Sequence, residues 1–487
     1  MEPLDRIAEL EVRNVELDAE NTALRARVAE LNEQVAVLVG KLADFEKLLG
    51  RNSSNSSKPP SSDAGTAKSA RPENANRAGR RAMARKQGKQ PGAPGATLSQ
   101  VPDPDVVVLH RPVRCRDCDR ALDDAVLVGS SSRQVFDVPD PTVIVTEHRA
   151  EKRRCVCGYE TTALFPPEAT APACYGPSIK AHALYLMCAQ HLPRERCAQA
   201  LTDLFGVSVS TGTLDNWMRE AADALVGFLA VVGGQLAAAP VVHADETSVR
   251  SHNKALWVHV CCTALLTLLH VGRRDKATVE TGPLGTYTGT IVHDRLAMYF
   301  NYGTGHVLCN AHILRSLNEL LGNHRHQIWA RAFIDLIIDT KKRVDATRTA
   351  GKTALSAYHQ RRIRKRWDAL CDDAARAAPP AITGTYLYGT NKDARLLAAA
   401  LAKHRDLFLA YTRNPSLPFD NNQAERDLRM IKLQAKISGE FRSPTGAARF
   451  AAIRSYISTN RKQTQPIHHH LKDLFNPTGA WLPAPTT

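Results

Sequence analysis

Three acidic residues stand in stretches that would bring them to one site. VVHADETSVR (241–250) carries an apolar run into Asp245, and TIVHDRLAM (290–298) carries another into Asp294. FDNNQAERDLRMIK (419–432) places Glu425 on an expected helix. Carboxylate oxygens are the ligands that Mg²⁺ prefers, and a pair of such ions promotes phosphoryl transfer by stabilising the attacking and leaving oxygens. We therefore predict a two-metal site in which Asp245 bridges both ions, Asp294 binds one and Glu425 the other.

Two basic residues follow Glu425 on the same expected helix. Arg429 is four residues later and Lys432 seven, so both fall on the helix face of the glutamate. Cations there would hold substrate phosphates beside the metal ions. Taken singly, each acidic residue has a commoner explanation, as a turn residue, a cap or a solvated side chain. The prediction depends on their occurring together.

Four cysteines form two local pairs. Cys115 and Cys118 make a CxxC, and Cys155 and Cys157 make a tighter CxC. Four thiolates in two pairs predict a structural tetrahedral zinc site, and the alternative is unliganded core cysteines. The start of the sequence has no signal-peptide pattern, so eleven cysteines indicate a reducing cytosol and metal rather than disulfides. Cys309 and His312 are a further candidate metal pair, although packing is the favoured interpretation.

The acidic residues need a sheet to position them. Residues 240–272 are expected to form three successive strands, a short helix falls within 273–284, and a fourth strand spans 288–295. This order is that of a ribonuclease-H-like sheet, with Asp245 at the end of the middle strand and Asp294 beside it. The long segment from about 312 to 418 is expected to be a helical insertion within this catalytic domain.

The charge balance points to a polyanionic partner. Lys and Arg number 64 against 49 Asp and Glu, giving a net charge of +15, which favours nucleic acid. Residues 51–100 contain ten of these cations against two acidic residues and almost no large apolar side chains, so we expect a disordered linker. This linker is either a DNA-binding arm or a solvated spacer; its candidate contacts are Arg80, Arg81, Arg85 and Lys86.

Two helical segments complete the expected architecture. Leucines recur every seventh residue from Leu10 to Leu38, with Asn14 and Asn21 in the facing positions, which predicts a parallel coiled-coil homodimer through residues 4–49. Residues 175–222 read as three helices, the third capped by Ser210 or Thr211, and suggest a helix-turn-helix. The apolar run 224–242 is expected to be a buried helix, a turn and a strand, so no membrane association is predicted.

The predicted fold is multidomain α/β, with boundaries set by these changes in pattern. The expected parts are a leucine-zipper coiled coil (1–50), a disordered basic linker (51–100), a small β-rich zinc-binding domain (101–174), helix-turn-helix-like DNA-binding helices (175–235), the ribonuclease-H-like catalytic domain (236–465, insertion about 312–418) and a polar C-terminal tail (466–487).

The motifs in this order resemble the insertion sequence 66 family of bacterial transposases. The resemblance is carried by NSSNSSKPPSSD, RKQGKQPGAPG, the cysteine pairs, YGPSIKAHALYLMCAQHLPRERCAQALTDLFGVSVSTGTLDNWM, VVHADETSVR, VHDRLAMYF, LCNAHILRSL and DNNQAERDLR. It implies a DDE transposase that cleaves DNA at element ends and joins them to target DNA. Its acidic triad falls on Asp245, Asp294 and Glu425, and its zinc segment falls on the four paired cysteines.

The resemblance also implies partners, metals and a cellular location. DNA is the substrate, Mg²⁺ is the expected catalytic ion with Mn²⁺ as a substitute, and Zn²⁺ is structural. Small accessory proteins of the same element are expected partners, and the bacterial cytoplasm, in association with the nucleoid, is the expected location. The alternative is a catalytically inactive, transposase-derived DNA-binding regulator, which would have no use for three intact acidic positions.

Overall fold

The structure is a computed structural model, and it describes residues 13, 16–35, 38, 98–252, 254–323, 327–377 and 390–485. The chain divides into two compact units, one comprising Met1–Asp63 with Val145–Thr487 and the other Ala64–Ile144. Each unit is described by itself. The candidate DNA-contacting residues Arg80, Arg81, Arg85 and Lys86 lie outside the described residues.

A mixed five-stranded sheet forms the centre of the larger unit. Its strands are β3 (Val241–Ser251), β4 (Lys254–Cys262), β5 (Thr267–Gly272), β6 (Thr290–His293) and β7 (Gly305–Leu308), in the spatial order β5-β4-β3-β6-β7. β3 pairs antiparallel with β4 and parallel with β6, because the helices α7 (Lys276–Glu280) and η3 (Pro283–Thr286) return the chain before β6. The α/β class and the expected strand positions are confirmed.

One detail of the strand prediction is wrong. Asp245 does not end its strand, because β3 continues six residues further and remains paired with β4 as far as Ser251. On its other side β3 has a shorter pairing, because β6 pairs with it only up to His243. Asp245 therefore lies where one edge of β3 loses its neighbour, and that edge is open to side chains from elsewhere in the fold.

Two long helices cover the sheet. α14 (Asn422–Ser438) packs against β3 and β4, and α15 (Pro444–Lys462) packs against β5. α15 is buried over most of its length. Its Ser455 Oγ and Thr459 Oγ1 accept hydrogen bonds from backbone amides of the edge strand β5, at 2.8 and 3.1 Å, in place of the carbonyls of another strand. These bonds fix the helix in register with the strand.

Short helices precede the sheet. They are α3 (Pro177–Leu184), the π-helical turn η2 (Tyr185–Ala189), α4 (Arg194–Phe205), α5 (Thr211–Ala224) and α6 (Val226–Ala238). Ser210 caps α5 by accepting from the Thr213 N–H at 3.1 Å, as predicted, whereas the first of the three expected helices becomes α3 followed by η2. Among the described residues, no single helix is long and apolar enough to cross a membrane; α5 and α6 meet that test only as a pair bent by 47°.

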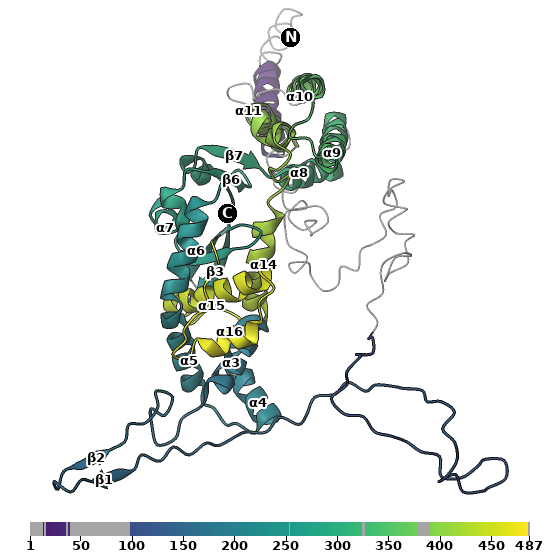
Figure 1. Cartoon of the computed structure of the whole chain (residues 1–487). Coiled ribbons are helices and arrows are strands. Elements are labelled where there is room, and N and C mark those ends of the chain that lie inside the picture. Colours follow the sequence, from purple (N-terminus) through teal and green to yellow (C-terminus); the bar gives the residue numbers. More distant parts are fainter. Residues whose placement is uncertain are drawn as a thin grey trace, which may run out of the picture. The chain divides into compact units, whose positions relative to one another are not determined.

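The helical insertion has a hydrophobic core of its own. It comprises α8 (Asn310–Asn323), α9 (Ile328–Thr349), α10 (Ala357–Ala377), α11 (Thr390–Lys403), α12 (Arg405–Phe408) and α13 (Ala410–Arg413), and Figure 1 shows α8 to α11 grouped together. Trp367 is fully buried between Phe333 and Phe408, with ring centroids 5.0 and 6.0 Å away. The insertion is thus a folded body rather than a long loop.

The C-terminal segment differs from the expected polar tail. It forms α16 (Ile467–Asp473), whose Leu471 is fully buried, and the chain beyond it is bonded to the core through Trp481 N–H and Tyr456 Oη at 3.0 Å. The segment packs on the core through a few apolar residues spaced among polar ones, so its polar composition did not predict the packing. These residues are Leu471, Leu474 and Trp481.

The cysteine-containing segment is poorer in strands than expected. Among its described residues, the structure has only the hairpin β1 (Lys152–Arg154) and β2 (Glu160–Thr162) and one bridge between Arg114 and Ala121. The apolar runs 106–110, 125–129 and 142–148 form no strands. Their valines are exposed, as in Val107 and Val128, so neither a pairing strand nor a buried face supports them. The prediction of a β-rich domain here is not confirmed.

The N-terminal segment is helical where the structure describes it. Residues 16–35 form one helix, and its heptad leucines Leu17, Leu24 and Leu31 are exposed. The remainder of the expected coiled coil lies outside the described residues.

Candidate active site

Asp245 and Asp294 leave neighbouring strands at the same level. The pairing between β3 and β6 ends at His243 and Val292. Asp245 follows His243 by two residues, and Asp294 follows Val292 by two residues. Because side chains alternate between faces along a strand, both aspartates share the face of that last pair. The short final strand β7 continues beyond β6 and leads into the insertion.

The carboxylate of Asp245 lies in a field of negative charge. Burial raises the pKa of Asp245 to about 8, and the charges of Asp294, Glu246 and Glu425 act in the same direction. The Glu246 N–H, which donates to Asp245 Oδ1 at 2.9 Å, opposes them. Carboxylates from the end of β6 and from α14 are therefore close enough to Asp245 to act on its ionisation.

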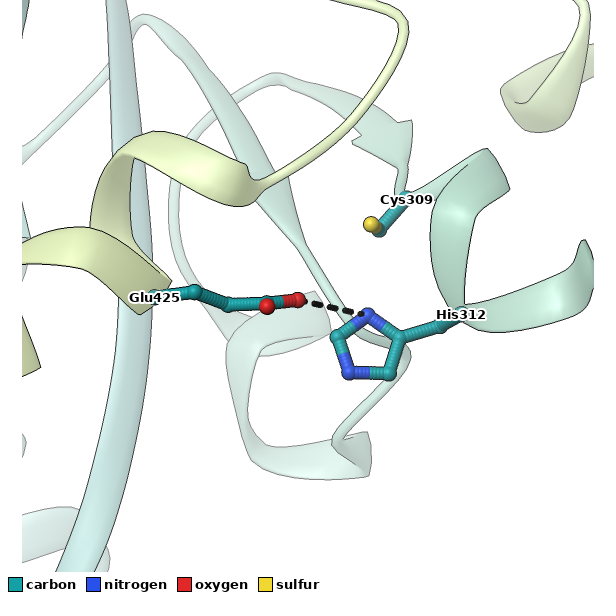
Figure 2. Close-up of side chains that lie close together, drawn as sticks. All are labelled: Cys309, His312 and Glu425. Atoms are coloured by element: carbon teal, nitrogen blue, oxygen red, sulfur yellow. Dashed lines mark ion pairs between the residues drawn. The ribbon is translucent and has the colours of Figure 1, made fainter. Parts of the chain in front are cut away.

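Glu425 lies in the first turn of α14 and is held from the insertion. Arg315 of α8 donates to both carboxylate oxygens, at 2.8 and 3.1 Å, and His312 Nδ1 lies 3.6 Å from Oε1. Figure 2 shows Glu425 and His312 directed toward each other, with Cys309 beside them; the ligand atoms of the three lie within 4.8 Å of one another. One helix face of α8 therefore orients the third carboxylate.

Asn421 fixes the start of α14 against the sheet. Its Nδ2 donates to the Ala244 carbonyl at 2.9 Å, and its Oδ1 lies 2.9 Å from His243 Nδ1. Its backbone N–H donates to Cys309 Sγ at 3.1 Å. The side chain is fully buried, so these bonds replace its hydration. Asn421 thus ties the residue before Asp245, the entry to α8 and the helix of Glu425 together.

The backbone beside Asp294 is strained. Arg295 has φ of 85°, in the left-handed region that residues with a side chain rarely adopt. Asp294 Oδ1 accepts from the Leu296 N–H at 3.0 Å, which closes this turn. Such conformations cost about 1–3 kcal/mol and cluster at functional sites, where the surrounding structure holds them. Here the strain turns the chain sharply after β6 and fixes the position of Asp294.

Glu246 belongs to the opposite face of β3. Its side chain is paired with Arg274 at 2.7 Å and accepts the Tyr299 hydroxyl at 2.6 Å. Burial and this carboxylate raise the pKa of Tyr299, so the hydroxyl remains a donor. Glu246 therefore has the partners of a structural residue and adds negative charge behind Asp245.

The donor set fits hard divalent cations. Asp245, Asp294 and Glu425 offer carboxylate oxygens, and their mutual repulsion would be relieved by bound positive charge. Cys309 fits a metal less well, because burial raises its thiol pKa to about 12 and its sulfur already accepts backbone N–H groups of Asn421 and His312. Burial lowers the pKa of His312 against the charge of Glu425, which leaves a neutral imidazole beside the carboxylate. The oxygen set is the stronger metal candidate.

The remaining predicted residues are distributed as follows. Arg429 and Lys432 are exposed on α14, where they can meet a ligand. Within their own segments, Cys115 and Cys155 each accept backbone N–H groups of the following residues, which lowers the thiol pKa and favours the thiolate that zinc requires. The two cysteine pairs belong to different compact units, and the four-cysteine zinc site remains a prediction.

Sequence reasoning missed three residues of the site. Arg315 was not singled out, although it follows His312 by three residues and so lies on the same face of α8. Asn421 was not singled out either; it precedes α14, but its side chain bonds β3 instead of capping the helix. Arg295 carries no local signal, because its strain is imposed by the fold.

Comparison with protein families gives two matches. The family described as "Transposase IS66 family" matches residues 172–449, more than half of the chain. It includes all the strands of the five-stranded sheet, the insertion and α14. A "Family of unknown function (DUF6444)" matches residues 4–99, the expected coiled coil and basic linker. Among curated proteins, none matches this chain.

Proposed function

The chain belongs to the IS66 family of transposases, and from this membership we propose that it cleaves DNA at the ends of its insertion sequence and transfers the freed strands to target DNA. One observation carries the proposal. Asp294 and Glu425 lie close enough to Asp245 for their negative charges to add to the effect of burial, which raises the pKa of Asp245 to about 8. A carboxylate cluster of this kind is suited to divalent metal ions.

We assign Asp245, Asp294 and Glu425 as the ligands of two Mg²⁺ ions, which Mn²⁺ can replace. When bound, the ions supply activation of the attacking oxygen and stabilisation of the leaving oxygen in phosphoryl transfer. Asp245, central to the cluster, would help to hold both ions. Arg315 and His312 hold Glu425 in place, and Arg429 and Lys432 on the exposed side of α14 bind backbone phosphates.

The strand order supports assignment of the catalytic domain to the ribonuclease-H-like class. Three successive antiparallel strands followed by a fourth strand parallel to β3 is the arrangement expected from the sequence, and β7 adds a fifth strand beside β6. The carboxylates then occupy the middle strand, the end of the next strand and a following helix. α4 and α5, joined by a turn with Gly206 at φ 67°, are proposed to bind the element ends as a helix-turn-helix, and residues 4–49 to form a homodimer.

The test is strand cleavage on labelled DNA that carries the element ends, with and without Mg²⁺. Asp245→Asn should lose cleavage by about 10³-fold or more while retaining DNA binding, since the metals supply several kcal/mol of transition-state stabilisation. Asp335→Asn, an exposed aspartate of α9 without an ion pair in the described chain, is the matched control and should cleave normally.

The possible results separate the hypotheses. Cleavage by Asp245→Asn at the wild-type rate would refute the residue assignment. Wild-type protein that binds the ends but does not cleave them with Mg²⁺ or Mn²⁺, even with the accessory proteins of the element added, would favour the regulator instead.

A further inference from the structure

A basic pocket lies between α9 and α10 of the insertion. It has a volume of about 280 Å³ and is lined on the α9 side by Arg343 and on the α10 side by Arg362 and Arg366. Arg362 and Arg366 are four residues apart and therefore lie on one face of α10, opposite Arg343. The helices are in contact, and Figure 1 shows them beside each other in the insertion.

Among the described residues, none is a counter-ion of these three arginines. In the part of the chain that the structure describes, no hydrogen bond or ion pair is formed by any of these guanidinium groups, whereas nearby Arg364 pairs with Asp406 and Lys341 with Asp345. Asp339 is the one acidic residue in the pocket lining, and its carboxylate pairs with Lys342 at 3.4 Å. The pocket therefore carries an excess of positive charge.

Two further polar groups line the same pocket. Thr340 is only 1% exposed, and its buried hydroxyl has no hydrogen-bond partner among the described residues. His359 directs Nδ1 to Ser356 Oγ at 2.8 Å, which leaves its other ring nitrogen for a ligand. A buried hydroxyl without a partner is destabilising, and an anion that accepts a hydrogen bond from it would remove this penalty.

Apolar side chains also line the pocket. They are Leu336 and the buried Ile363, and the next turn of α10 places Trp367 in the core against Phe333. The two helices are thus held apart by packed side chains rather than by the arginines themselves. Removing an arginine should leave the helices in place, which makes the pocket testable by substitution.

We propose that this pocket binds a phosphate group of the DNA backbone, so that the insertion is a DNA-binding surface. Planar guanidinium groups match phosphate oxygens with paired hydrogen bonds, and three of them surround this pocket. The basic surface continues beyond it, because Arg361 and Lys365 are exposed on the same helix. An extended polyanion fits this continuity better than a free phosphate compound. The proposal rests on the proposed function, since it adds a binding site for the same DNA substrate.

The test compares two pairs of substitutions on α10. Arg362→Gln with Arg366→Gln removes two cations from the pocket, and Arg361→Gln with Lys365→Gln removes two exposed cations outside its lining. Binding to labelled duplex DNA is measured over a salt series by fluorescence anisotropy. The pocket pair should weaken binding by about tenfold or more and reduce the slope of log K against log salt by about one for each phosphate that is no longer bound. The control pair leaves the pocket intact and should reduce the affinity and the slope by less than the pocket pair does.

Further variants and ligands cover the alternatives. Arg343→Gln, on the other helix, should reproduce part of the loss of affinity, and thermal unfolding checks that each variant is folded. Equal effects from the pocket and control pairs, or no effect from either, would overturn the proposal. If pyrophosphate binds the wild type and not the pocket pair, while DNA binding is equal in both, the ligand is a free phosphate compound and the DNA assignment is wrong. Loss of cleavage in Asp245→Asn is independent of all these results.

Discussion

At the scale of single residues, the site depends on side chains that are not themselves acidic. Asn421 is the clearest example, because one buried amide joins β3 to the helix that carries Glu425. Arg315 acts similarly from the insertion by gripping the carboxylate itself. Residues that orient metal ligands typically matter 10- to 100-fold for activity.

Asn421→Ala should therefore reduce cleavage by about 10- to 100-fold and lower stability by roughly 2 kcal/mol, because the buried Ala244 carbonyl and His243 lose their partner. Cleavage kinetics and urea unfolding measure the two effects. Asn422→Ala is the matched control: its backbone N–H donates to Asp420, a bond that alanine keeps, so its kinetics should match the wild type. Equal behaviour of the two variants would contradict the role given to Asn421.

At the scale of elements, β4 and β5 carry a pair of stacked histidines. The rings of His259 and His270 are 5.1 Å apart, and their residues pair across the two strands. Burial lowers the pKa of His270 from 6.5 to about 4, and the charge of His259 adds to this effect. As the pH falls, His270 is therefore protonated in the unfolded chain before it is protonated in the folded protein. The neutral, buried His270 makes its full contribution to stability above pH 6.5, and this contribution is lost as the pH falls toward 4.

His270→Gln should consequently lose less stability than the wild type when the pH is lowered from 7.5 to 5. The difference should approach roughly 2 kcal/mol, from the gap between the two pKa values. Urea unfolding at both pH values measures it, and His148→Gln, at an exposed position, provides the comparison. If His270→Gln and the wild type lose the same free energy of unfolding between pH 7.5 and 5, protonation of His270 does not destabilise the protein in acid.

Elements differ in how far the sequence predicts them. The strands around Asp245 and Asp294 were predictable because apolar periodicity and turn residues are local signals, as was the Ser210 cap. The length of β3 was not, since pairing with β4 is a tertiary effect that carries polar residues into the sheet. The hydrogen bonds of Asn421 were not predictable either, because its partners are 177 and 178 residues away in the sequence.

At the scale of the whole molecule, self-association is the open prediction. The described part of the expected coiled coil is a helix whose Leu17, Leu24 and Leu31 are exposed within one chain. A seam of this kind gains stability by pairing with a second copy.

Replacing Leu24 and Leu31 with lysine should therefore convert a dimer into a monomer, because charges in the seam would be buried against each other. Sedimentation equilibrium measures the mass. Ala26→Lys with Glu33→Lys places lysines on the outer face of the same helix and should leave the dimer intact. A wild-type protein that sediments as a monomer would refute the prediction outright.

The two ends of the insertion meet at the site. Asn310 N–H donates to the Phe419 carbonyl at 3.1 Å, and Asn421 N–H donates to Cys309 Sγ at the same distance. A segment that leaves and returns through adjacent backbone positions can be lengthened, shortened or exchanged with little strain on its host. The insertion can therefore diversify as a cassette during evolution, provided that its first helix keeps His312 and Arg315 against Glu425.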